Sequence, residues 1–336
     1  MHAWQAVAEG DPKDVFQLVE VPAPLCGPGQ VRLMVESCGL NYPDLLMVQG
    51  KYQVHPTIPF TPGSEICGRV VDGDGANVGE RVLAMPPRPN GGLAEEVVVP
   101  HQMVRSIPQS ISSDDAACLQ VTYPTAHIAL HHRGGLRTGE SVLVHAGAGG
   151  VGSAAIQLAR ANGCRVFATA GGPEKTAVCR ALGVHVAIDY NNEDFVEVVL
   201  TETHGKGIDI VVDPVGGDVF ERSRRCVASE GRIMVVGFTS GVIAQMSTNH
   251  PLLKNYAVVG VNLGHLQRAN PELMNTVHAD LMQLYEAGLI RPLIRSVVDF
   301  AEARSALVAL SERRTVGKTV VRVSGLVATS PSGHAT

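Results

Sequence analysis

Two patterns of hydrophobic and polar positions divide the chain. Over the first 120 residues, short Val-rich runs at 31–35, 68–71, 81–84 and 96–99 alternate with stretches rich in Gly and Pro. Such runs, bounded by turn residues, are typical of antiparallel strands. From position 123 to about 261, strand-like runs at 142–144, 166–169, 186–189, 208–213 and 233–236 alternate with helical stretches. That alternation predicts a parallel sheet covered by helices.

A mixed segment follows, and it indicates how the domains are connected. The pattern predicts an amphipathic helix near 272–287, a strand at 296–299, a helix at 301–313 and a last strand at 317–323. We expect this segment to rejoin the first domain, so that residues 1–122 and 263–324 form one domain and residues 123–262 form another. Small and polar residues at 325–336 predict a disordered tail.

The segment Gly147-x-Gly149-x-x-Gly152 follows an apolar run and precedes a helical stretch. In this context the pattern is typical of a dinucleotide-binding turn. Gly147 permits the tight turn, Gly149 lets the backbone approach a pyrophosphate, and Gly152 allows close packing of helix on strand. The phosphates would lie at the helix N-terminus. The sequence therefore predicts a nucleotide cofactor in the second domain.

Composition removes several other classes of function. The 336 residues carry 27 Lys and Arg against 32 Asp and Glu, and only 4% are aromatic, which argues against nucleic acid as a partner. The N-terminus lacks a secretory signal pattern, and no apolar run reaches the length of a membrane span. Seven cysteines, none in a C-x-x-C pair, suit free thiols in a reducing compartment. We expect a cytoplasmic protein.

Further motifs resemble one known family, the zinc-independent, ζ-crystallin-like quinone oxidoreductases of the medium-chain dehydrogenase/reductase superfamily. Within it, the chain is most similar to the quinone oxidoreductase-like protein 2 group. The matching segments beyond the glycine turn are Asn41-Tyr42-Pro43-Asp44, Pro62-Gly63-Ser64-Glu65, Asp213-Pro214-Val215-Gly216-Gly217, Gly231-Arg232, Gly237-Phe238 and Gly317-Lys318.

The resemblance implies an α/β protein with two domains. One is a GroES-like catalytic domain of the antiparallel β-barrel type, and the other is a Rossmann domain with a doubly wound parallel sheet. It also implies a homodimer, which we expect to form through an edge strand around residues 256–261.

Two positions predict that the chain binds no zinc. Alcohol dehydrogenases of the same superfamily hold a catalytic zinc with the Cys of a Gly-x-Cys-His segment and the His of a Gly-His-Glu segment. Here Asn41 and Ser64 occupy those positions, and residues 82–95 lack the cysteines of a structural zinc lobe. Without a Lewis acid the substrate should be an activated acceptor. A quinone or an α,β-unsaturated carbonyl compound fits.

The second predicted strand ends without the acidic residue that NAD-preferring sites usually carry. The resemblance assigns Lys175 and Tyr190 to the 2′-phosphate of NADPH, although Lys175 can also be read as a solvated helix lysine. Glu174 and the absence of a hydroxyl at Gly172 would weaken that preference. The full set expected to bind NADPH is Thr125, Gly147, Gly149, Gly150, Val151, Gly152, Gly172, Lys175, Tyr190, Val215, Gly237, Phe238 and Lys318.

Three residues near the N-terminus are the candidate catalytic group. The amide of Asn41 could donate to a substrate carbonyl as negative charge grows there. Tyr52 could donate a proton, because a phenol is protonated at neutral pH. Asp44 is expected to organise the Asn41 loop. Simpler alternatives are that Asn41 caps a turn and that Tyr52 only shapes the substrate site.

Three functions remain open at this point. The leading hypothesis is an NADPH-dependent quinone or enone reductase. A second is an enoyl-thioester reductase, because the segment from Asn41 to Tyr52 also resembles those enzymes. A third is a protein that binds NADPH without turnover, as a sensor or structural protein.

Overall fold

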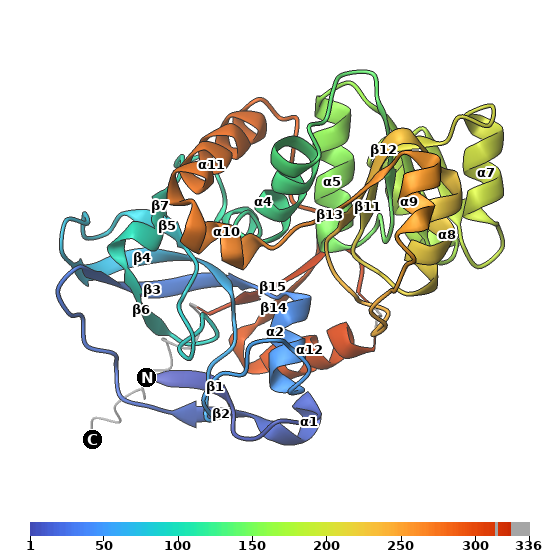
Figure 1. Ribbon diagram of the computed structural model, residues 1–336. Coiled ribbons are helices and arrows are strands. Elements are labelled where there is room, and N and C mark those ends of the chain that lie inside the picture. The colour runs from blue at the N-terminus through green and yellow to red at the C-terminus, as the bar shows by residue number, and fades with distance from the viewer. Residues whose placement is uncertain (313–314, 324–336) are drawn as a thin grey trace, which may run out of the picture. The chain divides into compact units, whose positions relative to one another are not determined.

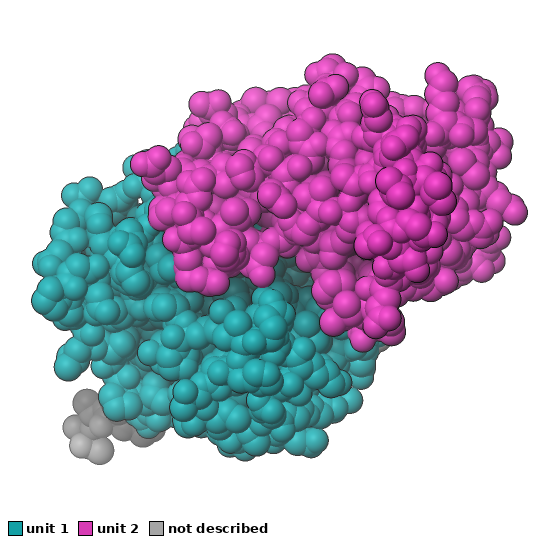
Figure 2. Space-filling view, in the orientation of Figure 1, with its two compact units in different colours: residues 1–121, 294–336 teal, residues 122–293 magenta. Residues whose placement is uncertain are grey.

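The computed structural model describes residues 1–312 and 315–323 (Figure 1). The tail predicted at 325–336 lies outside the described residues. The chain divides into two compact units, which Figure 2 colours separately. Unit 1 contains Met1–Val121 and Ile294–Thr336, and unit 2 contains Thr122–Leu293. The first unit is therefore discontinuous in sequence.

The second boundary lies later than we predict from the sequence. Residues 263–293 belong to unit 2, although the pattern assigns them to the first domain. The reason is the long helix α11 (Pro271–Glu286), which buries Val277 and Leu281 and packs against α4 (Thr122–His127). Asp280 of α11 also pairs with His127 at 3.3 Å. An amphipathic helix shows which of its faces is apolar but not which neighbour covers that face.

Unit 1 contains a largely antiparallel sheet in the order β14-β15-β3-β4-β5-β7, with β6 paired to β3. A short β1-β2 hairpin lies beside it. The strands are β1 (His2–Ala6), β2 (Phe16–Glu20), β3 (Gln30–Gly39), β4 (Glu65–Gly73), β5 (Arg81–Ala84), β6 (Glu96–Pro100), β7 (Val104–Ser106), β14 (Ile294–Asp299) and β15 (Lys318–Arg322). The helices are α1 (Pro12–Val15), α2 (Tyr42–Val48), α3 (Ser113–Ala116) and α12 (Ala303–Ser311).

The C-terminal strands complete this sheet. β15 pairs antiparallel with β3, which places Val321 beside Cys38, and Val321 is fully buried. At the other end of the chain, the indole of Trp4 donates to the carbonyl oxygen of Phe300 at 2.7 Å. The two ends of the sequence thus share one hydrophobic core.

Unit 2 is built on a parallel sheet in the order β10-β9-β8-β11-β12-β13. Its strands are β8 (Ser141–Val144), β9 (Arg165–Ala170), β10 (Val186–Asp189), β11 (Ile208–Asp213), β12 (Val227–Val235) and β13 (Ala257–Gly260). The further helices of unit 2 are α5 (Gly150–Ala161), α6 (Pro173–Ala181), α7 (Phe195–Glu202), α8 (Asp218–Cys226), α9 (Asn249–Lys254) and α10 (Leu263–Ala269). β8 and β11 lie side by side at the centre, where the strand order reverses. Nucleotides bind at this point in doubly wound sheets.

The predicted fold class is confirmed in both units. One sheet is mainly antiparallel and the other is parallel with helices between its strands. β13 lies at the edge of the parallel sheet, at the position predicted for an edge strand.

Candidate functional site

The carboxyl ends of the strands in unit 2 meet at one edge of the parallel sheet, and most predicted cofactor residues lie there. The glycine turn follows β8, Gly172 follows β9, Tyr190 follows β10, Val215 follows β11, and Gly237 follows β12. The fold therefore brings together segments that are far apart in sequence. Thr125 belongs to helix α4 and not to these loops, and its side chain is buried.

The glycine turn has no room for side chains at two of its three positions. A Cβ atom at Gly147 would lie 2.8 Å from Cβ of Ala168 and 2.9 Å from Sγ of Cys179. A Cβ atom at Gly152 would collide with the carbonyl oxygen of Ala146. Helix α5 begins directly after Gly149, so its free N–H groups point toward the turn. These residues fit a pyrophosphate, which takes hydrogen bonds from such groups.

At the same edge of the parallel sheet, the segments that follow β9 and β10 form a second loop cluster. Gly172 has a φ of 83° and precedes α6. Its N–H donates to Oδ1 of Asp189 at 2.7 Å. Tyr190 is exposed, and its hydroxyl would lie 2.6 Å from a Cβ atom at Gly171. Lys175 lies in the first turn of α6 and is half-buried.

The loops after β11 and β12 contact each other. Asp213 is buried and accepts hydrogen bonds from the N–H groups of Val215 at 2.8 Å and Gly216 at 2.9 Å. Burial raises the pKa of the Asp213 carboxyl, against the effect of those two donors. A Cβ atom at Gly216 would lie 2.8 Å from the ring of Phe238. The Asp-Pro-Val-Gly-Gly segment therefore shapes the loop that carries Val215 and supports Phe238.

His145, at the end of β8, has a structural role. Its Nε2 lies 2.8 Å from Oγ of Ser223, and its Nδ1 lies 2.9 Å from Oγ1 of Thr169. The Ser223 hydroxyl donates to the carbonyl oxygen of Val219, so it can only accept from Nε2–H of the imidazole. Burial lowers the pKa of His145 to about 3. The ring is therefore neutral and fully hydrogen-bonded.

In unit 1, Asn41 and Lys318 belong to a buried network around Glu65. The Lys318 ammonium donates to Oε1 of Glu65 at 2.7 Å, to Oδ1 of Asn41 at 2.8 Å and to the carbonyl oxygen of Leu40 at 2.6 Å. Its three hydrogens are thus all engaged. The other oxygen of Glu65 accepts from the N–H groups of Gln120 and Val121, both at 2.9 Å.

The amide of Asn41 is also fully engaged. Its Nδ2 donates to the carbonyl oxygen of Gly39 at 3.1 Å and to Oε1 of Glu65 at 3.0 Å, while its Oδ1 accepts from Lys318. This pattern fixes the orientation of the amide, because the reversed orientation would point two donors at each other. Asn41 can donate to a substrate oxygen only if one of these bonds is given up.

Asp44 accepts hydrogen bonds from the Asn41 loop and from residues 63 and 64. Its Oδ2 accepts from the N–H of Asn41 at 2.9 Å. Its Oδ1 accepts from the Ser64 hydroxyl at 2.5 Å and from the N–H of Gly63 at 3.2 Å. Burial raises the pKa of the Asp44 carboxyl, although these donors and the Lys318 charge oppose the shift. Burial alone would lower the pKa of Lys318, but the Glu65 carboxylate keeps it above its usual range.

Tyr52 is the predicted catalytic residue that stays outside the buried network. Its ring packs on the edge of the unit 1 core and lies under the guanidinium of Arg88, at 5.7 Å from the ring centroid. The Arg88 Nε contacts the sulfur of Met47 at 2.9 Å. Tyr52 and Arg88 therefore form a stacked pair of a phenol and a cation.

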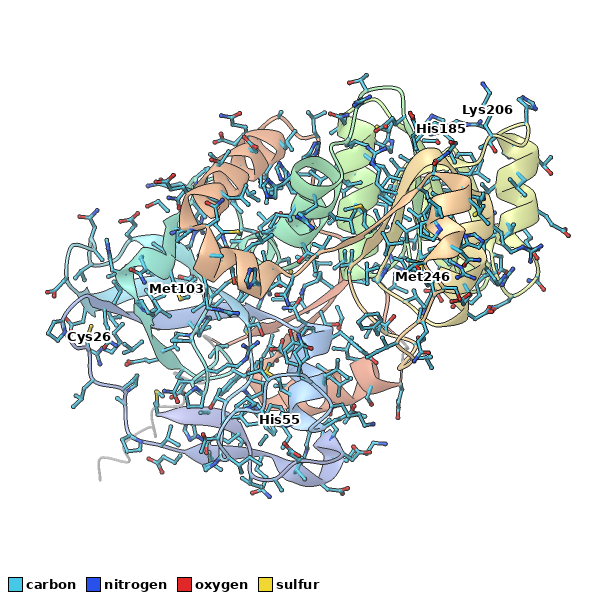
Figure 3. All side chains as sticks on the ribbon, viewed as in Figure 1. Cys26, His55, Met103, His185, Lys206 and Met246 are labelled. Carbon is cyan, nitrogen blue, oxygen red and sulfur yellow. The ribbon has the colours of Figure 1, made fainter. Side chains whose placement is uncertain are left out.

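Histidine and cysteine side chains are mostly tied to structural partners. Figure 3 labels His55 and His185; His55 pairs with Glu9 at 3.0 Å, and His185 accepts from the N–H of Val166. All seven cysteines are free thiols, and burial raises the pKa of Cys67 to about 12. Among the described residues, no three His, Cys, Asp or Glu side chains are gathered so that they could hold a metal ion.

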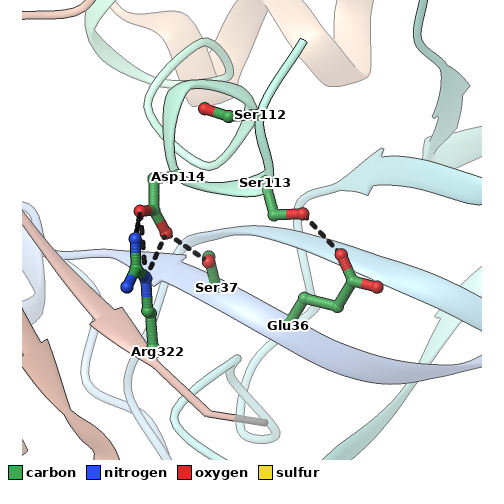
Figure 4. A pocket seen from close by; sticks show the side chains of 6 residues that line it. All are labelled: Glu36, Ser37, Ser112, Ser113, Asp114 and Arg322. Atoms are coloured by element: carbon green, nitrogen blue, oxygen red, sulfur yellow. Dashed lines mark hydrogen bonds and ion pairs between the residues drawn. The ribbon is translucent and has the colours of Figure 1, made fainter. Parts of the chain in front are cut away.

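A surface pocket of unit 1 also carries charged groups, but each of them already has a bonded partner (Figure 4). Arg322 of β15 forms three hydrogen bonds with Asp114 of α3, the shortest at 2.6 Å. Asp114 also accepts from the Ser37 hydroxyl at 2.7 Å, and Glu36 accepts from Ser113 at 2.5 Å. These bonds fasten α3 to the strands β3 and β15 of the sheet.

Comparisons with known proteins agree with the two units. Residues 27–109 match the alcohol dehydrogenase GroES-like domain, and residues 150–279 match the family described as zinc-binding dehydrogenase. A quinone oxidoreductase-like protein 2 homolog from Nematostella vectensis is 37% identical over 303 residues, which is 88% of this chain and 82% of the relative. The chain belongs to the medium-chain dehydrogenase/reductase superfamily.

Solved structures of the superfamily support the same assignment. The quinone oxidoreductase of Thermus thermophilus, studied alone and with NADPH, is 36% identical, with a TM-score of 0.84 over 96% of this chain and 100% of that protein. A mycobacterial protein in complex with NADPH is 30% identical, with a TM-score of 0.89 over the same shares. The predicted family and the GroES-like and Rossmann-like domains are confirmed. The protein is an oxidoreductase of this superfamily, and the NADPH complexes of its relatives support a nucleotide site here.

Two features of the site escape the sequence analysis. The sequence marks Glu65 only as part of a motif, because its partner Lys318 is 253 residues away. Asp189 escapes notice because an acidic residue is expected at the end of the second strand and not at the end of the third. Its position next to Tyr190 is the available signal.

Within residues 1–312 and 315–323, no helix is long and apolar enough to cross a membrane.

Proposed function

We propose that the protein is an NADPH-dependent reductase of quinones or α,β-unsaturated carbonyl compounds. The observation that carries the proposal is the glycine turn before α5, where side chains at Gly147 and Gly152 would not fit. A quinone oxidoreductase from Thermus thermophilus, of similar fold, was studied in complex with NADPH. Gly149, Gly150, Val151 and the other predicted residues at the strand ends would hold the cofactor.

NADPH, when bound, supplies a hydride for the acceptor. The protein must then supply a proton, and Tyr52 is the residue we propose for this step. Hydride addition to an enone leaves an enolate, which takes the phenolic proton. Bulk water reprotonates the phenolate. Asn41 and Asp44 hold the loop that precedes Tyr52, because their polar atoms already bind protein partners. They act as positioning residues in this proposal.

The test is oxidation of NADPH by the purified protein with phenanthrenequinone, a short enone or crotonyl-CoA offered separately, and with NADH as a second cofactor. We expect turnover of the quinone or the enone. Tyr52→Phe should lower kcat for the enone by about 100-fold, a usual contribution of a general acid. Tyr256→Phe is the matched control, because that hydroxyl bonds to His250 in unit 2 and should leave kcat unchanged.

Reduction of an enoyl thioester is the second candidate, and Arg88 favours it. Its side chain is exposed and stacks on Tyr52, and no carboxylate among the described residues forms an ion pair with it. A cation beside the proton donor could receive the phosphates of CoA. Turnover of crotonyl-CoA that depends on Tyr52 would promote this candidate. Binding of NADPH without turnover of any acceptor would favour a sensor or structural protein.

We also propose a homodimer that forms through β13. Among the described residues this strand has a neighbour on one side only, and Ala257 and Gly260 are exposed. An open edge is a ready surface for pairing with a second chain. Sedimentation velocity of the wild type and of a Val258→Pro variant would test this, because proline removes a donor from the edge.

A further inference from the structure

The loop cluster at the ends of β9 and β10 contains a fixed negative charge. Oδ1 of Asp189 accepts from the N–H of Gly172 at 2.7 Å and from the N–H of Asn191 at 3.1 Å. Oδ2 accepts from the side-chain amide of Asn192 at 2.9 Å. These donors, that of Gly172 foremost, lower the pKa of the Asp189 carboxyl. The carboxylate is therefore ionised at neutral pH.

The position of this charge matters because of its neighbours. Gly172 lies at the tip of β9, directly before α6, and Lys175 lies in the first turn of that helix. Tyr190 follows Asp189 in the chain. These are the residues expected at the ribose end of the cofactor, where a 2′-phosphate or a 2′-hydroxyl must be accommodated. A phosphate needs donors and positive charge, whereas a hydroxyl is well served by a carboxylate acceptor.

We propose that Asp189 sets the cofactor specificity of this site: it engages the Gly172 N–H and repels a 2′-phosphate, so that NADH is bound alongside NADPH. This inference rests on the nucleotide site of the proposed function. Two further acidic groups strengthen the argument. Glu193 accepts from the N–H of Asp189 at 2.8 Å, and Glu174 lies in the first turn of α6. Three carboxylates thus lie, together with the ammonium of Lys175, on the two chain segments that follow β9 and β10.

The carboxylate also offers a position for a ribose hydroxyl. Within the part of the chain that the structure describes, Oδ2 of Asp189 is bonded only by the amide of Asn192, and Asn192 is exposed. A 2′-hydroxyl can then donate to Oδ2, as it does to the acidic residue of NAD-binding sites. A 2′-phosphate in the same place has no hydrogen to donate when it is fully ionised, so it faces the carboxylate as a like charge.

The experiment measures binding, so that it does not depend on turnover. Adenosine 2′,5′-bisphosphate and adenosine 5′-monophosphate differ only in the 2′-phosphate, and their dissociation constants can be measured by calorimetry. Asp189→Asn keeps an oxygen for the Gly172 N–H and removes the charge. We expect it to bind the bisphosphate about tenfold more tightly, as removal of one charge near a phosphate predicts. Binding of the monophosphate should not improve.

Two variants serve as controls. Glu193→Gln removes a charge from the same turn but leaves the acceptor of the Gly172 N–H in place, and we expect less than about a threefold change. Lys175→Ala should weaken binding of the bisphosphate and leave that of the monophosphate unchanged. The melting temperature of each variant reports whether it folds.

Three results would overturn the inference. Unchanged dissociation constants for both ligands in Asp189→Asn would show that the charge does not act on the 2′-group. An equal change for both ligands would give Asp189 a structural role only. If the wild type bound neither ligand, the nucleotide site itself would fail, and with it the proposed function. If only the ratio failed to move, the proposed function would stand.

Discussion

Replacing Lys318 with Met should destabilise the protein strongly, because it removes the cation that faces Glu65. Both side chains are buried, with 4% and 0% of their surfaces exposed. Methionine fills a volume similar to that of the lysine stem but cannot donate. The Glu65 carboxylate would keep three weaker partners, which are the N–H groups of Gln120 and Val121 and the amide of Asn41.

The size of the effect follows from the geometry. At the observed Nζ–Oε1 distance of 2.7 Å, the attraction of two unit charges is about 6 kcal/mol at an effective dielectric constant of about 20. Part of this offsets the cost of burying the two charges. Loss of one partner of a buried pair typically costs about 3–5 kcal/mol. We expect about 3 kcal/mol here, because the three remaining donors still stabilise the carboxylate.

Urea unfolding of the wild type, Lys318→Met, Glu65→Gln and the double variant would measure this. The double variant should be more stable than the sum of the single changes predicts, by about 2 kcal/mol or more. Additive single changes, or a cost below about 1 kcal/mol for Lys318→Met at pH 7, would refute the reasoning.

Two further predictions concern unit 2. Gly152→Ala should weaken NADPH binding by more than about tenfold, because its Cβ would collide with the backbone that forms the glycine turn. Gly260→Ala is the control, because no described atom lies within 4 Å of the new Cβ. Equal affinities of the two variants in calorimetry would contradict the prediction. His145→Gln should flatten the dependence of stability on pH. The folded pKa of His145 is about 3, so below pH ~6.5 the unfolded chain binds a proton that the folded protein does not. His145 thus destabilises the wild type progressively as the pH falls, by about 2 kcal/mol at pH 5 relative to pH 7 and above. Parallel urea midpoints for the two proteins from pH 7 to pH 5 would show that the imidazole does not act in this way.

The sequence predicts those parts of the molecule whose geometry is local. The turn of Gly147 to Gly152 is one, because a strand, three glycines and a helix follow each other without a break. The alternating pattern likewise predicts the parallel sheet. The boundary at 293/294 escapes prediction because the neighbour of α11 depends on three-dimensional packing. The engagement of Asn41 escapes it for a similar reason, since Lys318 arrives from the last strand.

The role of a residue is hardest to predict where its partners come from other elements. Asn41 has the residue type of a substrate donor, but its hydrogens are already bonded. Asp189 has the type of a surface acid, but it holds the N–H of Gly172 from the neighbouring strand. Residue type and spacing indicate what a side chain can do, and only its contacts show whether it is free to do it.

The discontinuity of unit 1 has a consequence for biosynthesis. The ribosome makes the chain from its N-terminus, so all of unit 2, residues 122–293, is complete before β15 is synthesised. Until then, the β3 edge near Cys38 lacks the strand that covers it, and Glu65 has no ammonium to face. The nascent protein therefore carries a finished nucleotide-type domain beside an unfinished one. Emergence of β15 supplies the strand that pairs with this edge of β3 and the ammonium that faces Glu65.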